Sequence, residues 1–470
     1  MSASSSRPVV PAWLEVPTDP NDLAAGVWPH SSRRRPEGEL EIAGVSVGEL
    51  AATYGTPLYV LDEDEVRTRA RRTRAAFEAA AARHGTEARV YYAGKAFLST
   101  EVVRWVMGEG LTVDVCSAGE LAVALAGGAS PDRLGYHGNN KSAAQLRRAV
   151  DIGIGSIVVD SLDEISRLAQ ITAGRQSGQP VLIRVNTGIH AETHDFLATA
   201  HEDQKFGFSP DAARVAAARV REVPGLELIG LHCHIGSQIF GAAGFAASAE
   251  RLVALHAELL AGGDLPVLNL GGGFGIAYTR VDEPAVIEEL ADAIVDAVAA
   301  ACAAHGIALP RLAFEPGRSI VGPAGVTLYE IGTVKPVALG GDTTRTYVSV
   351  DGGMSDNARP ALYGAQYSAR LASRAGAGDP ELVRVVGSHC ESGDIVVDAE
   401  YLPGDVAPGD LLAVPATGAY CFSLSSNYNY APRPAVVAVR EGRARVIVRG
   451  ETVDDLLARD AGATVTKGEA

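Results

Sequence analysis

The sequence predicts an α/β plus β protein, in which a TIM (β/α)8 barrel is followed by a mainly antiparallel β-domain. From residue 57 to residue 322, short apolar runs alternate with Ala-, Leu-, Glu- and Arg-rich segments of helical periodicity. This alternation is typical of βα units with parallel strands. From residue 323 to residue 470, short strand-like runs are separated by Gly, Pro and Asp turns with few helices, as in antiparallel β-domains. A chain of 470 residues is long enough for both.

The barrel region contains one strand-like run more than the eight that close a TIM barrel. The runs lie at 58–61, 90–93, 112–115, 134–137, 157–159, 181–185, 228–234, 267–270 and 312–314. We expect 58–61 to be the surplus strand, so that the run 90–93 begins the barrel. Helical segments are expected at 63–84, 118–126 and 284–305, among others.

The β-domain is expected to form a barrel-like or sandwich-like sheet. Its predicted strands lie at 326–334, 346–350, 382–386, 394–397, 411–414 and 434–439. Residues 37–56, with a possible strand at 40–47, are expected to pack with this domain and to add an N-terminal strand to it. Residues 1–36 are rich in Ser, Pro and Arg, which predicts a partly disordered extension.

Composition narrows the class of protein. The formal charge of −16 argues against nucleic-acid and anionic-membrane partners. No apolar run approaches the ~20 residues that span a bilayer, and the first residues lack the core of a signal peptide. Five scattered cysteines without a Cys-x-x-Cys pair indicate a reduced environment. We therefore expect a cytoplasmic protein.

Lys95 is the first candidate for chemistry, because it stands where the predicted strand 90–93 ends. A cation at an apolar strand end is costly to bury unless it is paired or used, although a lysine can also simply reach solvent. Three later strand ends carry His-Ile-Gly-Ser (234–237), Gly-Gly-Gly-Phe-Gly (271–275) and Glu-Pro-Gly-Arg (315–318). Together they indicate a site for a phosphate-bearing cofactor that a lysine binds covalently.

The positions of these motifs fit the active-site face of a TIM barrel, where phosphate groups commonly bind after the seventh and eighth strands. Gly272 and Gly273 allow backbone N–H groups to approach a phosphate closely. Ile276 stands where the Rossmann glycine fingerprint would need glycine. Arg318 is interpreted as an anion clamp, and Glu315 as the partner of a cationic nitrogen. The structural alternatives are a plain glycine turn and an ion pair at the barrel rim.

No metal site is predicted. His232 and His234 lie on one face of a strand, and we expect no third ligand beside them. His234 is better interpreted as a ring stacked on a flat cofactor, with Ser237 bonding the phosphate. The other candidates lie in an irregular polar loop that lacks the H-E-x-x-H spacing: His190, Glu192, His194 and His201.

In the β-domain, the polar stretch 351–363 is too rich in turn residues to be interpreted as a simple strand. Cys390 lies beside Glu391 and Asp394, where a thiol is a poor nucleophile but retains a proton to donate. Gly418-Ala419-Tyr420 follows a predicted strand. Each of these segments also has a purely structural interpretation.

In combination, the motifs resemble those of the fold-type III pyridoxal-phosphate decarboxylases, which pair an alanine-racemase-like barrel with a β-domain. Within that group the chain most resembles the diaminopimelate decarboxylase family, from about residue 56 to about residue 434. The matching motifs run in the order Tyr-Tyr-Ala-x-Lys, His-x-Gly-Ser, Gly-Gly-Gly-Phe, Glu-Pro-Gly-Arg, Arg-Pro-x-Leu-Tyr, Cys-Glu-Ser-Gly-Asp and Gly-Ala-Tyr.

The resemblance implies a role for each matching residue. Lys95 would form the Schiff base with pyridoxal 5'-phosphate, and Glu315 would keep its pyridine nitrogen protonated. The other implied cofactor contacts are Asp114, Glu120, His234, Ser237, Gly272, Gly273, Gly317, Arg318 and Tyr420. The implied substrate contacts are Arg318, Arg359 and Tyr363 for a distal carboxylate, Glu391 for the distal ammonium, and Tyr420. Cys390 would donate a proton from the neighbouring subunit, which implies a homodimer with shared active sites.

The implied reaction is the decarboxylation of meso-2,6-diaminopimelate to L-lysine and CO2, the last step of lysine biosynthesis. The nearest alternative is a relative acting on ornithine, arginine or carboxynorspermidine, which would want an acid in place of Arg359. A catalytically inactive pyridoxal-phosphate-fold binding protein is the alternative from a different class, but it should have lost Lys95, Cys390 or the phosphate motifs. The Cys-Glu-Ser-Gly-Asp segment favours a decarboxylase over alanine racemase.

Overall fold

The computed structural model describes residues 10–175, 177–189, 205–340 and 343–463 and divides the chain into two compact units. The barrel unit comprises Val66–Ile276 and Glu283–Val321. The β-unit comprises Met1–Glu65, Ala277–Asp282 and Gly322–Ala470. The sequence placed 57–322 together in one domain, whereas contacts within the chain assign its first residues and the short segment 277–282 to the β-unit.

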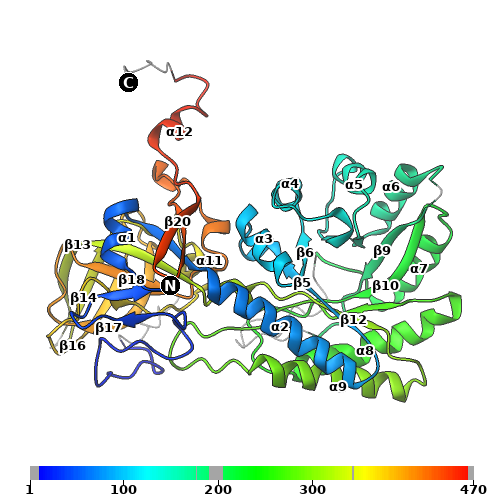
Figure 1. Cartoon of the computed structure of the whole chain (residues 1–470), viewed down its shortest axis with the longest axis horizontal. Helices are drawn as coiled ribbons and strands as arrows, with labels where there is room; N and C mark the ends of the chain where they lie inside the picture. The colour runs from blue at the N-terminus through cyan, green and yellow to red at the C-terminus, as the bar shows by residue number, and fades with distance from the viewer. Residues whose placement is uncertain (1–9, 176, 190–204, 341–342, 464–470) are drawn as a thin grey trace, which may run out of the picture. The chain divides into compact units, whose positions relative to one another are not determined.

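The barrel unit is closed by eight parallel strands. Figure 1 labels several of them together with the surrounding helices. They are β5 (Ala88–Ala93), β6 (Thr112–Val115), β7 (Leu134–Tyr136), β8 (Ser156–Val159), β9 (Gln179–Arg184), β10 (Leu226–His232), β11 (Val267–Asn269) and β12 (Arg311–Phe314). Pairing of β12 with β5 closes the ring. The predicted barrel is confirmed, and so is its first strand, because β4 (Leu58–Asp62) pairs with strands of the β-unit instead.

Helices follow the barrel strands, as the alternating pattern predicts. They are α3 (Thr100–Gly108), α4 (Ala118–Ala126), α5 (Ala143–Asp151), α6 (Leu162–Thr172), α7 (Pro210–Arg221), α8 (Ala243–Leu259), α9 (Ile287–Ala304) and α10 (Arg318–Val321), with α2 (Glu63–Arg83) before β5. A serine begins each of α3 to α7 and accepts a backbone N–H of the first turn through its side-chain oxygen. Such caps satisfy donors that the helix itself leaves unpaired, which explains where these helices start.

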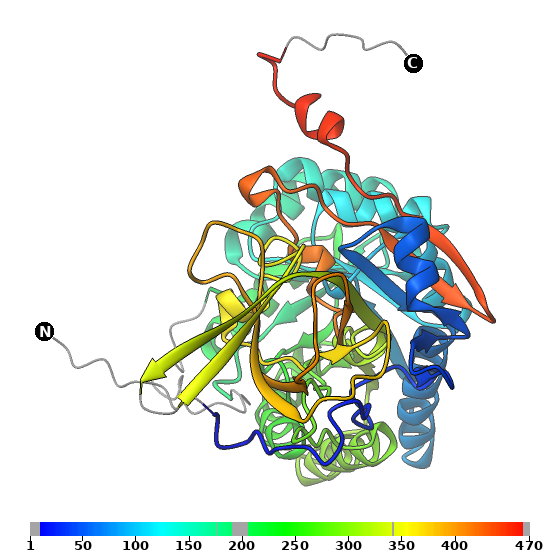
Figure 2. The same cartoon turned by 90° about the vertical axis from the view of Figure 1, so that its left-hand side faces the viewer.

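The β-unit contains a mixed, mainly antiparallel sheet in the order β17-β16-β14-β13-β4-β19-β20. Its strands are β13 (Gly325–Gly340), β14 (Thr343–Val350), β15 (Arg370–Leu371), β16 (Pro380–Val386), β17 (Ile395–Pro403), β18 (Leu411–Pro415), β19 (Val436–Arg440) and β20 (Arg443–Val448). Figure 2 shows the long antiparallel pair β13 and β14. Only β14–β16 and β4–β19 are parallel among the described strands of this sheet. The predicted β-domain is confirmed, and its added N-terminal strand is β4. The strand expected at 40–47 instead forms two short strands of a separate three-stranded sheet. The strands β15 and β20 are additions to the prediction.

The N-terminal residues of the β-unit form β1 (Arg33–Arg34), β2 (Leu40–Ile42), β3 (Val45–Ser46) and α1 (Val47–Tyr54). Leu40 and Leu50 are buried in one apolar cluster with Val326 of β13. Val27 and Trp28 are buried in the same cluster, which differs from the loosely held extension expected for 1–36. Burial of such large apolar side chains is favourable enough to order this segment.

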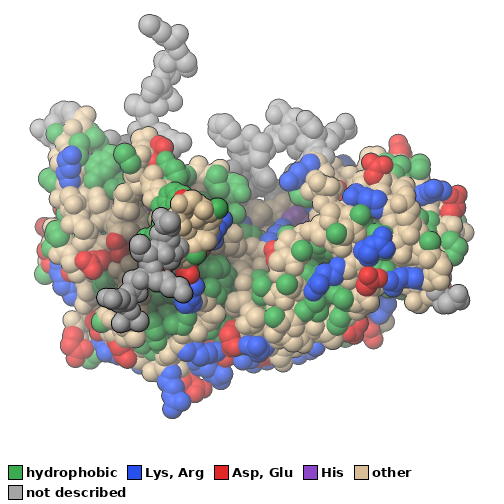
Figure 3. All heavy atoms as spheres, turned by 90° about the horizontal axis from the view of Figure 1, so that it is seen from above, with side chains coloured by type: hydrophobic (Ala, Val, Ile, Leu, Met, Phe, Trp, Pro, Cys, Tyr) green, Lys and Arg blue, Asp and Glu red, His purple; other side chains and the backbone are tan. Residues whose placement is uncertain are grey.

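No helix in the part of the chain that the structure describes is long and apolar enough to cross a membrane. On the face drawn in Figure 3, basic and acidic side chains are interspersed. The remaining α-helices of the β-unit in the described ranges are α11 (Arg359–Tyr363), between β14 and β15, and α12 (Val453–Leu457), after β20.

Candidate functional site

Lys95 lies in a single 3-10 turn, η1 (Gly94–Ala96), directly after β5. Its side chain is exposed while Gly94 and Ala96 are buried. A Cβ atom at Gly94 would lie 2.7 Å from the backbone oxygen of Asp114, so glycine lets the turn pass close to β6. The turn is fixed further by the Tyr92 hydroxyl, which donates to the backbone oxygen of Phe97 at 2.6 Å. The structure therefore places Lys95 at the carboxyl-terminal mouth of the barrel, as the sequence predicts.

The glycine motif after β11 forms a turn that only glycine can build. Gly271 and Gly273 have φ angles of 70° and 113°, a region that other L-residues rarely adopt. A Cβ atom at Gly272 would lie 2.0 Å from the backbone oxygen of Glu315. One at Gly273 would lie 2.5 Å from the backbone oxygen of Gly236. The turn is thus packed tightly against the two neighbouring strand ends.

His234 follows β10 and is held in one orientation by this turn. The backbone N–H of Gly272 donates to His234 Nδ1 at 3.3 Å. Burial, together with the positive charges of Lys95 and Arg184, lowers the pKa of His234 well below its ordinary value. Since Nδ1 accepts a hydrogen bond, the ring is the neutral Nε2–H tautomer and offers an uncharged face.

Two basic and polar groups of the predicted phosphate site come together at the same mouth. Arg318 Nη2 donates to Ser237 Oγ at 2.8 Å. Gly317, immediately before Arg318, packs so tightly that a Cβ atom would lie 3.0 Å from the Cβ of Ala93. The ends of β5, β10 and β12 therefore meet here, and they bring the predicted anion-binding residues into one cluster.

The Glu315 carboxylate is surrounded by donors from three other strand ends. Asn269 Nδ2 donates to Glu315 Oε1 at 2.7 Å. His232 Nε2 lies 3.1 Å and His137 Nε2 lies 3.5 Å from the same oxygen. Burial alone would raise the pKa of Glu315, but the two histidines outweigh it and hold the pKa below its ordinary value. Glu315 is therefore a carboxylate that can accept from a cationic nitrogen.

The structure corrects one expectation about metals. No third ligand was expected beside His232, yet His137, His232 and Glu315 offer ligand atoms that all lie within 4.8 Å of one another. Strand order explains the difference, because His137 comes from the end of β7 on another side of the barrel. The nitrogen and oxygen atoms of this group already contact one another. The loop with His190, Glu192, His194 and His201 lies outside the described residues.

Asp114, in β6, carries a buried carboxylate with one unsatisfied oxygen. Its Oδ1 lies 3.2 Å from His137 Nε2, while Oδ2 has no hydrogen-bond partner among the described residues. Burial and the nearby Glu315 raise the pKa of Asp114 well above its ordinary value. Glu120 lies one turn further on, and its Oε2 accepts the backbone N–H of Cys116 at 2.7 Å. A buried oxygen without a partner is rare and indicates a missing polar ligand.

The buried histidines make acid stability a test of this geometry. Burial lowers the pKa of His232 and of His137 to about 4. An unfolded chain with a histidine pKa of roughly 6.5 then binds protons first as the pH falls. We expect the free energy of unfolding to decrease from about pH 6.5 to about pH 4, and His232→Gln to flatten that decrease. Urea unfolding at pH 5 and pH 7 measures this change in the free energy of unfolding, and His305→Gln, at an exposed histidine, is the control. The same change between the two pH values in wild type and both variants would contradict the prediction.

In the β-unit, Arg359 begins α11 and is only 7% exposed. Its guanidinium lies 4.6 Å from the ring centroid of Tyr278, and its Nη1 donates to the Tyr367 hydroxyl at 2.6 Å. No carboxylate pairs with Arg359 in the ranges that the structure describes. Tyr363 is 70% exposed at the end of the same helix. A buried cation held by two tyrosines, without an anion, is poised to bind one.

In the Cys390–Asp394 motif, one acidic residue is buried and holds the loop, whereas two other residues are exposed. Asp394 is buried and accepts the backbone N–H groups of Met354 at 2.6 Å and His389 at 2.8 Å. Cys390 and Glu391 remain exposed. Tyr420 has a positive φ of 61°, a strained conformation for tyrosine that often marks functional segments. Asp394 thus shapes the loop, while Cys390 and Glu391 are free to contact a ligand.

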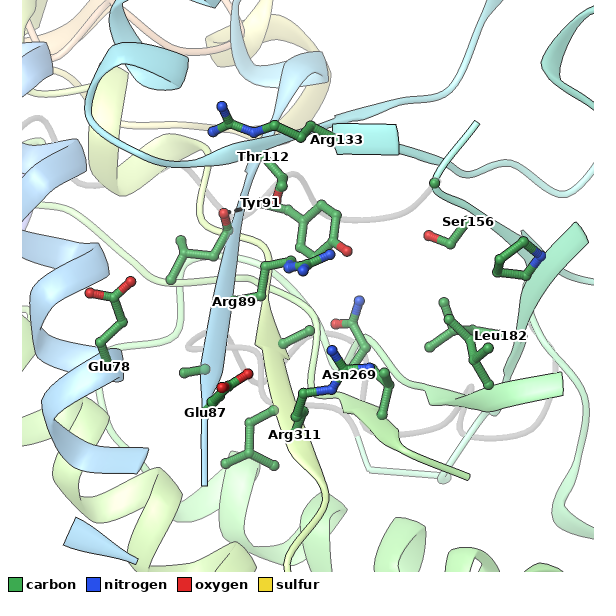
Figure 4. Close-up of a pocket in the computed structure, with 18 of the residues that line it drawn as sticks. Glu78, Glu87, Arg89, Tyr91, Thr112, Arg133, Ser156, Leu182, Asn269 and Arg311 are labelled. Carbon is green, nitrogen blue, oxygen red and sulfur yellow. Dashed lines mark hydrogen bonds between the residues drawn. The ribbon is translucent and has the colours of Figure 1, made fainter. Parts of the chain in front are cut away.

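A separate cavity of about 770 Å³ opens at the amino-terminal ends of the barrel strands (Figure 4). Arg89, Arg311 and Glu87 line it, and Tyr91 and Asn269 lie deeper within the barrel. Lys95 follows the opposite end of β5, so this cavity is distinct from the candidate site. Sequence patterns did not identify Asn269 or His137, because neither belongs to a polar motif.

Comparisons with known proteins agree with this geometry. Residues 63–322 match the family model of the pyridoxal-dependent decarboxylase, pyridoxal binding domain. Diaminopimelate decarboxylases of Corynebacterium efficiens and Mycobacterium tuberculosis are each 51% identical to the chain over 443 residues. These alignments cover 93% of this chain and 95% and 98% of the two relatives.

Solved structures show the same fold. The diaminopimelate decarboxylase of M. jannaschii in co-complex with L-lysine superposes with a TM-score of 0.85 at 30% sequence identity. The match covers 92% of this chain and 98% of that one. Because both the sequence identity and the coverage are high, the chain belongs to the diaminopimelate decarboxylase family of pyridoxal-dependent decarboxylases.

Proposed function

We propose that this chain releases CO2 from meso-2,6-diaminopimelate to give L-lysine, using pyridoxal 5'-phosphate, as the last step of lysine biosynthesis. The observation that carries the substrate assignment is the buried Arg359, which has no carboxylate partner in the described chain. A substrate ending in a carboxylate supplies that partner. A substrate ending only in an amine would bring a second positive charge to the same place.

The residues at the barrel mouth fit the cofactor. The glycine turn leaves no room for a Cβ atom, and Arg318 adds a positive charge beside Ser237. These features suit a phosphate. The unsatisfied Oδ2 of Asp114 and the neutral ring of His234 suit a flat polar ring. The residues that would hold the cofactor are Lys95, Asp114, Glu120, His234, Ser237, Gly272, Gly273, Glu315, Gly317, Arg318 and Tyr420.

When bound, the cofactor supplies a conjugated cationic ring that accepts the electron pair left behind by CO2. Glu315 would keep this ring cationic, because its carboxylate is an acceptor for a cationic nitrogen. Its lowered pKa suits that task, since a protonated Glu315 could not stabilise a positive charge. Lys95 would be the covalent attachment point and would move protons at the substrate amine.

Substrate binding is divided by charge. Arg359, with Arg318 and Tyr363, orients the distal carboxylate, and Glu391 pairs with the distal ammonium. The cage of Tyr278 and Tyr367 holds the Arg359 guanidinium without neutralising it. We further propose that Cys390 reaches the site from the neighbouring subunit and donates the proton that replaces CO2.

A subunit-mixing experiment tests the shared site. Lys95→Ala and Cys390→Ala subunits are expected to be inactive separately, because each lacks one essential group in every site. After dissociation and random reassociation, half of the dimers are mixed, and one of their two sites is intact. The mixture should recover about a quarter of wild-type activity by dimer symmetry. Absence of recovery, with mixed dimers demonstrated by two affinity tags, would contradict a site built from two subunits.

The substrate assignment is tested by CO2 release from purified protein loaded with pyridoxal 5'-phosphate. Separate reactions contain meso-diaminopimelate, ornithine, arginine and carboxynorspermidine. We expect release from meso-diaminopimelate alone, with L-lysine as product. Release from a polyamine precursor would contradict the proposed role of Arg359. No release from any of the four would favour the inactive binding protein.

A further inference from the structure

Asn269 is the last residue of β11, and its side chain is buried with 4% exposure. Its amide makes two hydrogen bonds to different parts of the candidate site. Nδ2 donates to Glu315 Oε1 at 2.7 Å, and Oδ1 accepts the backbone N–H of Gly271 at 2.8 Å. One side chain therefore joins the Glu315 carboxylate to the first residue of the glycine turn.

The two oxygens of Glu315 are engaged differently. Among the described residues each accepts one hydrogen bond, Oε1 from Asn269 Nδ2 at 2.7 Å and Oε2 from His232 Nε2 at 3.3 Å. His232 Nε2 and His137 Nε2 also lie 3.1 Å and 3.5 Å from Oε1. Oε1 thus has the short hydrogen bond and the closer ring nitrogens, so Oε2 keeps more capacity for a further donor. The asymmetry identifies which oxygen meets an incoming donor.

We propose that Asn269 is a positioning residue that anchors Oε1 and thereby presents Oε2 to the pyridine N–H of the cofactor. The inference deepens the proposed function and rests on Glu315 facing that nitrogen. Without the amide, Glu315 can rotate and share both oxygens with His232. The hydrogen bond to the pyridinium then loses its fixed direction, and the nitrogen gives up its proton more easily.

The second hydrogen bond of Asn269 couples this contact to the glycine turn. The N–H of Gly271 is bound by Asn269, while the oxygen of Gly271 accepts the N–H of Glu315 at 2.8 Å. Gly271 is thus tied to both the side chain of Asn269 and the backbone of Glu315. These hydrogen bonds fix the distance between the Glu315 carboxylate and the glycine turn. A rigid cofactor that carries both a pyridine nitrogen and a phosphate could therefore contact both at once.

Asn269 also lines the cavity at the amino-terminal ends of the barrel strands, and Figure 4 shows it there with Arg89 and Tyr91. The amide therefore lies between that cavity and the Glu315 carboxylate. Truncating the side chain would admit water from the cavity to Oε1. Water competes with fixed donors and makes the carboxylate a poorer partner for a buried cation.

The test uses full-length protein loaded with pyridoxal 5'-phosphate that carries 15N at the pyridine position. The 15N chemical shift distinguishes a protonated from a neutral pyridine nitrogen. Asn269→Ala removes both hydrogen bonds. Asn269→Ser keeps an acceptor near the Gly271 N–H but is too short to reach Oε1. Asn186→Ala is the matched control, because Asn186 Oδ1 accepts the N–H of Gly188 at 3.0 Å in the same kind of turn.

We expect both Asn269 variants to shift the 15N signal toward the neutral form and to bind the cofactor roughly 10-fold to 100-fold more weakly, as for a lost hydrogen bond to a charged group. Asn186→Ala should match wild type in both measurements. A wild-type 15N signal in the Asn269 variants, or an equal shift in Asn186→Ala, would overturn the proposal. Failure of both Asn269 variants to fold would also overturn it, by assigning the residue to the fold.

These outcomes are separable from failure of the proposed function. A neutral pyridine nitrogen in the wild-type protein would refute the role of Glu315 itself. Absence of CO2 release from wild type with a protonated nitrogen would refute the substrate assignment and leave Asn269 in place.

Discussion

Lys95→Ala is expected to abolish covalent attachment of the cofactor and to lower turnover by at least roughly 10²–10⁴-fold, the contribution of a lost acid–base group. The reason is the position of Lys95, which the end of β5 and the buried glycine before it place at the barrel mouth, near His234 and Asp114. The measurement is mass spectrometry of the peptide containing residue 95 after borohydride reduction of the loaded protein.

Lys335→Ala is the control for this variant, because Lys335 is an exposed lysine of β13 in the other unit. It should retain the reduced cofactor on Lys95 and keep wild-type turnover. A cofactor adduct of unchanged yield in Lys95→Ala would show that another residue forms the covalent bond. The barrel mouth would then need a different interpretation.

Arg359→Ala is expected to weaken substrate binding by roughly 2–5 kcal/mol, the cost of removing one partner of a buried charge pair. The guanidinium is already desolvated and held by Tyr278 and Tyr367, so the substrate carboxylate would lose its main partner. KM should rise far more than kcat falls. Arg359→Lys should recover part of the loss, since a lysine keeps the charge but cannot bind a carboxylate through two parallel hydrogen bonds.

Arg384→Ala provides a control in the same unit, because Arg384 forms an ion pair with Asp398 and has no proposed role in substrate binding. Its KM should equal that of wild type. Turnover of Arg359→Ala near the wild-type rate at low substrate would refute the distal-carboxylate clamp.

The barrel and the strand-end positions of its motifs were predictable because their signals are local. Lys95 ends an apolar strand, and Gly272 stands where any side chain would strike the backbone of Glu315. Residue type and position along one strand suffice for such predictions. The surplus strand at 58–61 followed from counting strands against the eight that a barrel needs.

Contacts across the fold were not predictable in this way. His137 and Asn269 acquire their roles because β7, β11 and β12 place them around Glu315. Arg359 owes its cage to Tyr278, which belongs to the short segment that contacts assign to the β-unit. The sequence alone does not single out Tyr278 or Asn269, because the partners of both residues lie on distant elements. The buried N-terminal Trp28 was missed because Ser, Pro and Arg dominate the composition around it.

The most direct measurement compares kcat/KM of the wild-type protein for meso-diaminopimelate and for D-lysine. Because the product is L-lysine, the carboxylate that leaves meso-diaminopimelate is the one at its D centre. D-lysine shares that reacting D centre and the distal amine, and it lacks only the distal carboxylate that Arg359 is proposed to bind. We predict a preference for meso-diaminopimelate of roughly 30-fold or more, which corresponds to 2 kcal/mol at about 1.4 kcal/mol per tenfold. Equal kcat/KM values, with cadaverine formed from D-lysine as fast as L-lysine forms from meso-diaminopimelate, would contradict the central claim.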